Sequence, residues 1–404
     1  MNVRRTAAVL AAIAVLGGAS APAASAASPS PSAPPLPAAL YGTADPTYDG
    51  VWRQSLALLA QHTVGVRPAV KAVDWLAGQQ CANGAFAAYR ADPKADCDAK
   101  TQVDTNSTAA AVQALAALGG HDAQTGKAVE WLKSVQNEDG GWGFTAGGAS
   151  DTNSTSTVVG ALAAVGAKPQ ETKSAKGHSP YDALTKLSLP CDGKDGGAFA
   201  YQPDKKGALA ANADATAAGA LAALGKGFVS GPGKTAGTPT CTDADTATAI
   251  AHNGTAYLAG ALEKTPYLKS AMPGATSQPD YGNTADAVVA LAAAGLSSAA
   301  EGPLAWLEKN AADWAEKSGP AGYAQLVFAA HATGTDPRAF GTVDLVDKLG
   351  ATGPAPQSAG KTATDKVVSQ TDSGNAVWWF VGVFLVAGIG IGFLLSGRNR
   401  KRQP

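Results

Sequence analysis

Charged residues are scarce in this chain of 404 residues. Asp, Glu, Lys and Arg make up 16% of it and the formal net charge is −1, whereas an average soluble protein has about 25% charged residues. Apart from the last few residues, Lys and Arg form no basic stripe, so a nucleic-acid partner is not expected. There are five His residues and no HxxxH or CxxC spacing, so we expect no metal site.

The two ends of the chain carry signals for export and for membrane anchoring. Residues 1–26 combine a basic start, a short apolar run and Ala-Ser-Ala, which is typical of a secretory signal peptide. Residues 376–396 include nineteen consecutive uncharged residues, enough for a helix to cross the ~30 Å hydrocarbon core of a lipid bilayer. The basic tail 397–404 places the C-terminus in the cytoplasm by the positive-inside rule. We therefore expect an exported protein that is anchored in the cell membrane by its C-terminal helix.

The remaining segments divide into two linkers and one folded unit. Residues 27–40 are rich in Pro, Ser and Ala and form a lead-in. Residues 350–375 are rich in Pro, Ser, Thr and Gly without an apolar period, which is typical of a flexible stalk. Residues 41–349 are left as one domain, large for a single core but normal for a closed array of repeats.

Cysteine is rare, and its four copies are expected to be paired in an exported chain. Three pairings are possible, and the sequence alone does not choose among them. We favour Cys81–Cys97, because closing a loop of that size is worth ~3 kcal/mol in the chain-entropy model. Cys191–Cys241 then follows by elimination. The alternative is a zinc site that uses the Asp96-Cys97-Asp98 triplet.

Two stretches of the domain have nearly the same sequence. KAVDWLAGQQCANGAF (71–86) and KAVEWLKSVQNEDGGW (127–142) share Lys-Ala, Trp-Leu, Gln, Gly and an aromatic residue at equal spacing. Their charges lie on one side, which predicts amphipathic helices that face solvent. A second kind of segment follows each glycine turn: DTNSTAAAVQALAALG (104–119) recurs as DTNSTSTVVGALAAVG (151–166). These segments are apolar nearly all round and have polar first residues, which predicts N-capped, buried inner helices.

Counting the two kinds of segment predicts six inner and six outer helices. The first inner helix has no outer partner before it, and the last outer helix has no inner partner after it. LLAQHTVGVRPAV (58–70) also resembles VFAAHATGTDPRAF (327–340), so the two ends are expected to pair. The predicted fold is all-α, a closed (α/α)6 toroid. We expect inner helices near 48–61, 104–118, 151–165, 212–224, 281–295 and 320–333, and outer helices near 68–79, 123–136, 179–188, 246–262, 299–311 and 337–349.

The repeat at 71–86 and 127–142 resembles the QW repeat of squalene and oxidosqualene cyclases. Protein prenyltransferase β subunits share this repeat within the terpenoid cyclase/protein prenyltransferase α/α-toroid superfamily. The likeness is sharp in these two copies and partial in KDGGAFAY (194–201). In that family the Gln closes off an outer helix and the aromatic residue stacks in the turn. The resemblance therefore implies an architectural role for the motif.

A third branch of the toroids, the cobalamin carriers intrinsic factor and transcobalamin, is similar in another respect. Their inner helices open with Asp-Thr-Gly-Ala-like motifs, and the DTNST string at 104–108 resembles them. The resemblance implies a corrinoid that lies on the barrel mouth near the helix starts, covered by a β-domain. This chain has no β-domain, so another surface protein would have to supply it.

Catalysis has less support in the sequence. Class II terpene cyclases protonate an alkene with the middle acid of DxDDTA, and the nearest string here is DADTATA (243–249). It keeps Asp243 and Asp245 but has Thr246 in place of the last acid, and it is expected to cap an outer helix. Three inner helices contain no aromatic residue to stabilise a carbocation. The aromatic residues that could serve from the others are Tyr48, Trp52, Tyr281, Tyr323 and Phe328.

Polar side chains gather at the starts of the inner helices. A toroid brings these starts to one face, where free N–H groups and short polar side chains surround one mouth. Each residue alone reads as an N-cap, but the set suits a polar, amide-rich ligand better than a hydrocarbon. The candidate ligand-binding residues are Asp104, Asn106, Ser107, Asp151, Asn153, Ser154, Asn212, Asp214, Asn283 and Asp286.

The sequence thus predicts a non-catalytic binding protein with no covalent cofactor. It would hold a polar small molecule, a corrinoid such as cobalamin, and hand it to a membrane transporter. Two alternatives stay open: a terpenoid cyclase/prenyltransferase-like enzyme, and a structural scaffold that docks another surface protein.

Overall fold

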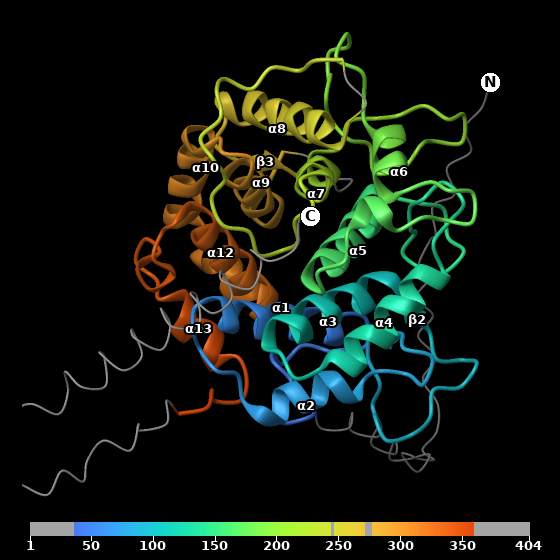
Figure 1. The fold of residues 1–404 in the computed structure, drawn as a ribbon. Helices are drawn as coiled ribbons and strands as arrows, with labels where there is room; N and C mark the ends of the chain where they lie inside the picture. The colour runs from blue at the N-terminus through green and yellow to red at the C-terminus, as the bar shows by residue number, and fades with distance from the viewer. Residues whose placement is uncertain (1–35, 244–245, 271–276, 359–404) are drawn as a thin grey trace, which may run out of the picture.

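The computed structural model describes residues 36–243, 246–270 and 277–358 (Figure 1). The predicted signal peptide, membrane helix and basic tail lie outside these residues, as does most of the stalk. Within the described part, no helix is both long enough and apolar enough to cross a membrane. The helices are α1 (Gly50–Thr63), α2 (Val70–Gly78), α3 (Thr105–Leu118), α4 (Asp122–Ser134), α5 (Thr152–Ala164), α6 (Pro180–Leu187), α7 (Ala213–Ala223), α8 (Ala247–Glu263), α9 (Tyr281–Ala293), α10 (Ser297–Asn310), α11 (Ala312–Ser318), α12 (Pro320–Thr333) and α13 (Leu345–Ala351).

Six of these helices form a closed inner ring. In chain order α1, α3, α5, α7, α9 and α12 each pack against the next, and α12 packs against α1. Figure 1 shows the chain passing once round the ring, from blue α1 to orange α12. The inner helices are rich in Ala, which lets their backbones approach closely around a common centre. The predicted toroid is confirmed.

The outer helices α2, α4, α6, α8 and α10 each pack on two neighbouring inner helices. The predicted sixth outer helix at 337–349 is wrong in detail. A 3-10 turn, Pro337–Ala339, precedes α13, and the chain restarts because Phe340 and Val343 exchange two backbone hydrogen bonds of 3.1 and 3.0 Å. Asp344 then caps α13. The short helix α11, which packs on α12, was not expected from the sequence.

The two ends of the domain meet, as predicted from the unpaired first and last helices. α13 packs on both α1 and α12. Gly42 donates its N–H to the carbonyl of Thr352 at 2.8 Å, and the Tyr41 hydroxyl donates to the carbonyl of Pro354 at 3.0 Å. Tyr41 is completely buried, so residues just before α1 and just after α13 are part of the same core.

The repeat at 71–86 and 127–142 forms a joint between consecutive outer helices. In both copies the Gln side chain donates to the carbonyl of the turn glycine, Gln80 to Gly84 at 2.9 Å and Gln136 to Gly140 at 2.7 Å. Both glycines have a positive φ, and a Cβ on them would lie 2.3 and 2.1 Å from a backbone oxygen of the next outer helix or its N-cap. Trp142 lies in the same turn, is buried, and donates to a carbonyl of α4. Only glycine allows this close approach.

Two short antiparallel pairs supplement the helices. β1 (Phe86–Ala87) pairs with β2 (Val103–Asp104), and β3 (Leu268–Lys269) pairs with β4 (Pro279–Asp280). β1 follows an outer helix, and β2 and β4 each run directly into an inner helix. These two-residue strands were not predicted, because they carry no alternating pattern long enough to read.

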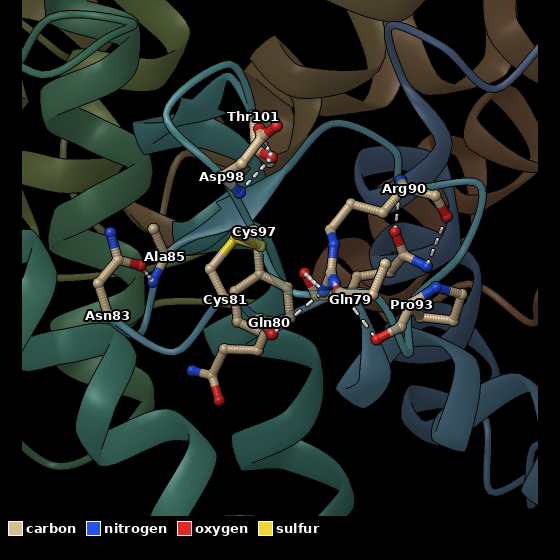
Figure 2. The surroundings of a disulfide bond; sticks show 12 residues. Gln79, Gln80, Cys81, Asn83, Ala85, Arg90, Pro93, Cys97, Asp98 and Thr101 are labelled. Atoms are coloured by element: carbon tan, nitrogen blue, oxygen red, sulfur yellow. Dashed lines mark hydrogen bonds between the residues drawn. A yellow bond between two sulfur atoms is a disulfide. The ribbon is translucent and has the colours of Figure 1, made fainter.

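Both favoured disulfides are formed, Cys81–Cys97 and Cys191–Cys241. Cys97 therefore has no thiolate to offer a zinc ion. Figure 2 shows the first bond at the base of a loop that is held by Arg90. The Gln79 side chain accepts from the Arg90 N–H at 2.7 Å and donates back to its carbonyl at 3.3 Å. The loop is thus tied to the end of α2 by a covalent bond and by hydrogen bonds.

Candidate functional site

Four inner helices begin with a side-chain cap at the same mouth of the toroid. The capping oxygen accepts from the backbone N–H three residues further on, at 2.6–3.0 Å. Ser107, Ser154 and Asn283 supply three of those N–H groups, so these predicted ligand-binding residues take part in capping. The caps of α3, α5, α7 and α9 are Asp104, Asp151, Asn212 and Asp280.

The predicted polar ring is therefore incomplete and partly misaligned. α1 and α12 begin without a side-chain cap, so four of the six inner helices contribute one. Asp280, which the sequence analysis did not select, caps α9 and holds Asn283 through both backbone and side chain. Aligning the segments on their shared Thr would have revealed it, because Asp280 lies four residues before Thr284, as Asp104 lies before Thr108.

That recurring Thr has a structural role that the sequence analysis missed. In each of the four segments its hydroxyl oxygen accepts the backbone N–H of the residue that follows the glycine turn or its counterpart, at 2.9–3.0 Å. Most of the DTNST motif thus joins the turn of one repeat to its inner helix. The four Thr residues are Thr108, Thr155, Thr216 and Thr284.

In three of these inner helices the second residue is polar and takes no part in the cap. Asn106, Asn153 and Asp214 occupy this position in α3, α5 and α7. Asn153 Nδ2 donates to Asp214 Oδ2 at 2.6 Å. The Oδ1 atoms of Asn106 and Asn153 are buried without a hydrogen-bond partner. Buried polar atoms normally have partners, so these two acceptors are the predicted residues best placed to serve a ligand.

Two exposed aromatic side chains lie beside the same helix starts. The carbonyl of Phe144 accepts from the N–H of Thr105, and that of Tyr201 accepts from the N–H of Thr152. Their side chains are 52% and 43% exposed. Burial raises the pKa of the Tyr201 hydroxyl, and the negative charge of Asp151 raises it further. Neither residue was selected from the sequence, although each follows the aromatic residue of a glycine turn by two positions, Phe144 after Trp142 and Tyr201 after Phe199.

The ring encloses a lumen with a cavity of about 100 Å³. Every inner helix lines it, together with the segment that follows α7. Its polar side chains include Gln113, Ser156, Asp214, Asp286 and Gln325, and its large apolar side chains include Trp52, Leu56, Phe228 and Phe328. Of the five aromatic candidates named from the sequence, Trp52 and Phe328 line this cavity. Tyr281 instead stacks on Trp306 and Trp314, and Tyr48 is 88% exposed.

Asp286 reaches the lumen from the second turn of α9 and is not part of the mouth. Gln325 Nε2 donates to its Oδ2 at 3.1 Å. Burial raises the pKa of Asp286 to about 8, and the nearby Asp214 adds to the rise. Burial also raises the pKa of Asp214, and the hydrogen bond from Asn153 partly offsets this rise. Asp286 is therefore largely protonated at neutral pH.

A segment without helix or strand, residues 225–243, covers the other end of the lumen. We call it the strap; it is the yellow-green segment after α7 in Figure 1. The N–H of Phe228 donates to Gln113 Oε1 at 3.0 Å, and its ring meets Trp52 edge-on at 5.4 Å between centroids. Further along, Gly233 donates to the carbonyl of Ala292 at the end of α9. The strap thus inserts an aromatic residue that no sequence pattern placed in the lumen.

The region of the DADTATA string lies away from the lumen. Thr246 caps α8, as predicted, and its hydroxyl accepts from the N–H of Ala249. Asp243 is exposed, and Asp245 lies outside the described residues. Within the ranges that the structure describes, no group of three or more His, Cys, Asp and Glu side chains is arranged to hold a metal ion.

Comparison with known proteins supports the toroid superfamily. A solved structure described as the crystal structure of a protein from Actinoplanes has 14% sequence identity and a TM-score of 0.48, covering 73% of this chain and 93% of that chain. The comparison with curated proteins finds no match. The family model of the prenyltransferase alpha-alpha toroid domain matches residues 51–235, from α1 into the strap. This match over residues 51–235 supports the predicted α/α-toroid superfamily.

Proposed function

We propose that this protein binds a polar small molecule at the mouth of the toroid. The observation that carries this is the pair of unpartnered acceptors, Asn106 Oδ1 and Asn153 Oδ1, at equivalent positions of neighbouring inner helices. A ligand with N–H donors would satisfy both. The exposed rings of Phe144 and Tyr201 lie beside the same helix starts and offer apolar faces to the body of that ligand.

A corrinoid is the first candidate ligand. Its peripheral carboxamides carry N–H donors that match the two acceptors, and its macrocycle offers a face for the two aromatic rings. A lumen cavity of about 100 Å³ is far below the ~300–1,000 Å³ of a pocket for a drug-sized ligand. The ligand would therefore rest on the mouth with its other face uncovered. A β-domain surface protein could close over that face.

Transfer to a membrane transporter is the proposed purpose. Two disulfides are consistent with an oxidising location outside the cytoplasm. The predicted anchor and stalk would hold the domain close to the outer face of the cell membrane. A short flexible linker raises the effective concentration that a membrane partner meets to the order of mM.

The test is titration calorimetry of the full-length protein with cobalamin, with and without a candidate β-domain partner. The variant combines Asn106→Ala and Asn153→Ala with Asp104→Asn and Asp151→Asn, because Asn preserves the caps. We expect cobalamin to bind the wild type and to lose at least tenfold in affinity with the variant, at unchanged helical circular dichroism. The control carries Asp74→Asn and Asn310→Ala, both on exposed outer helices. Absence of binding under every condition would refute the proposal.

One observation favours a second candidate, an enzyme that donates a proton. The largely protonated Asp286 shares the lumen with Trp52, Phe228 and Phe328, so the lumen is less poor in aromatic residues than the sequence implied. Conversion of a polyprenyl substrate, abolished by Asp286→Asn and retained by Asp74→Asn, would establish it. If neither cobalamin nor a polyprenyl lipid produced heat in the titration, a structural scaffold that docks another surface protein would be the remaining alternative.

A further inference from the structure

We propose that the lumen is a second binding site, which takes the ammonium group of a small organic cation between Asp214, Asp286 and Ser156. This site is separate from the mouth, and it does not depend on a corrinoid ligand. It is built from three neighbouring inner helices, α5, α7 and α9.

Asp214, and Asp286 once it has lost its proton, bring negative charge into the lumen, and no described residue forms an ion pair with either carboxyl. Each receives a hydrogen bond from a neutral amide, Asp214 from Asn153 and Asp286 from Gln325, and an amide does not neutralise charge. Lys226 also lines the cavity, yet none of the ion pairs found among the described residues includes it or either Asp. The charge of the carboxyls is thus left for a ligand to balance.

Ser156 supplies an independent sign of a missing ligand. Its side chain lines the cavity and is 7% exposed, and its Oγ is buried without a hydrogen-bond partner. A buried hydroxyl without a partner lowers stability. Together with the two carboxyls it provides three acceptors, and a primary ammonium has three N–H donors.

The rest of the lining suits a short hydrocarbon chain. Trp52, Phe228 and Phe328 line the same cavity, and aromatic faces attract cations as well as apolar groups. A cavity of about 150 Å³ in another protein holds benzene, whereas this one measures about 100 Å³. An ammonium with three or four carbons is therefore the size to test.

Binding should be coupled to proton release. The charged groups around the site are Asp214, Asp280 and Asp286, with Lys226 on the strap side and Asp151 beyond Asp214. The pKa of Asp286 is raised to about 8 by burial and by Asp214, so a cation that binds at pH 7 displaces its proton. Affinity should rise as the pH increases from about 6 to about 8 and stay high until the ammonium itself loses its proton.

The experiment is calorimetry of the full-length protein with n-butylammonium, and with 1-butanol as a neutral ligand of similar size. Measurements at pH 7 in two buffers of different ionisation enthalpy report the released proton. We expect butylammonium to bind at least tenfold more tightly than 1-butanol, and the gap to widen at pH 8.5. Asp214→Asn and Asp286→Asn should each weaken it tenfold or more, and Ser156→Ala severalfold. Asp74→Asn should leave it unchanged.

Equal affinity for the alcohol and the ammonium would overturn the proposal, as would full affinity in the Asp286→Asn variant with a normal melting curve. Failure of n-butylammonium to bind at pH 8.5 would also overturn it. The mouth is tested separately by Asp104→Asn with Asn106→Ala, which leaves Asn153 in place. This variant should lose cobalamin and keep butylammonium, so each proposal fails or stands by itself.

Discussion

Asn153 Nδ2 donates a 2.6 Å hydrogen bond to Asp214 Oδ2 and so joins the first turns of α5 and α7. The bond connects the mouth, where Asn153 keeps an unpartnered Oδ1, to the lumen, which Asp214 lines. One side chain therefore fixes the position of a carboxyl that belongs to the second proposed site.

Removal of this bond should raise the pKa of Asp214. The hydrogen bond from Asn153 lowers that pKa against the effect of burial, so Asn153→Ala leaves burial unopposed. Carboxyl NMR titration of the variant should show Asp214 ionising at a higher pH than in the wild type. The matched control is Asn106→Ala, the equivalent position in α3, which should leave the Asp214 titration unchanged. Identical titrations in wild type and Asn153→Ala would contradict the geometry.

Stability should fall as the pH rises, and Asp286 should account for part of the fall. Its pKa is raised in the folded state to about 8 from the ordinary 3.8, so the folded protein binds more protons than the unfolded chain between these values. The free energy of unfolding then decreases by up to about 1.4 kcal/mol per pH unit over that range. Asp286→Asn should flatten the curve between pH 4 and 8, as measured by urea denaturation. Parallel curves for variant and wild type would show that Asp286 ionises normally.

Gly140 should tolerate no side chain, for a reason beyond its positive φ. A Cβ there would lie 2.1 Å from the carbonyl oxygen of Ser179, whereas Gly177 also has a positive φ and nothing within 4 Å of an added Cβ. Gly177→Ala should cost about 1–2 kcal/mol from backbone strain alone. Gly140→Ala should cost at least ~3 kcal/mol, because the next outer helix must also move. Equal losses in urea denaturation would mean that the close approach is not required.

The two disulfides should differ in what they contribute. The chain-entropy model assigns about 3 kcal/mol to the loop between Cys81 and Cys97, and about 4 kcal/mol to the longer loop between Cys191 and Cys241. Paired Cys→Ser variants should therefore lower the free energy of unfolding, the second slightly more than the first. Non-reducing peptide mass spectrometry should first recover both linked peptides. Any other linkage, or free thiols in the exported protein, would refute the pairing.

The Tyr41 hydroxyl should hold the two ends of the domain together. It donates to the carbonyl of Pro354 and lies 3.1 Å from Gln61 Oε1 in a completely buried position. Tyr41→Phe should cost about 1–2 kcal/mol, because the carbonyl of Pro354 loses its donor away from water. Tyr48→Phe, at an 88% exposed position, should change stability by less than about 0.5 kcal/mol. A neutral Tyr41→Phe would mean that the ends are joined by other contacts.

Local rules were enough to predict the ring. The caps at Asp104 and Asp151, the glycine turns and the apolar inner segments each specify where a helix begins, ends or faces, so the helix bounds are right to within a few residues. The unpaired first and last helices implied closure, and the structure joins them through Gly42 and Thr352. The exceptions, α11 and the broken segment before α13, depend on packing against α12 and on a backbone pair between Phe340 and Val343.

The chemistry of the lumen was decided only by the tertiary structure. The sequence of an inner helix that is apolar nearly all round does not show which of its faces points to the centre. Nothing therefore indicated that Ser156 and Asp286 face the lumen. The strap has no periodicity, so Phe228 could not be placed next to Trp52. The raised pKa of Asp286 comes from burial and from Asp214 on another helix, and desolvation by distant segments leaves no trace in the residues beside it. The sequence determined the helices and their order, because capping and amphipathicity act over a few residues. The lining of the lumen was decided by folding, because its side chains come from six inner helices and the strap.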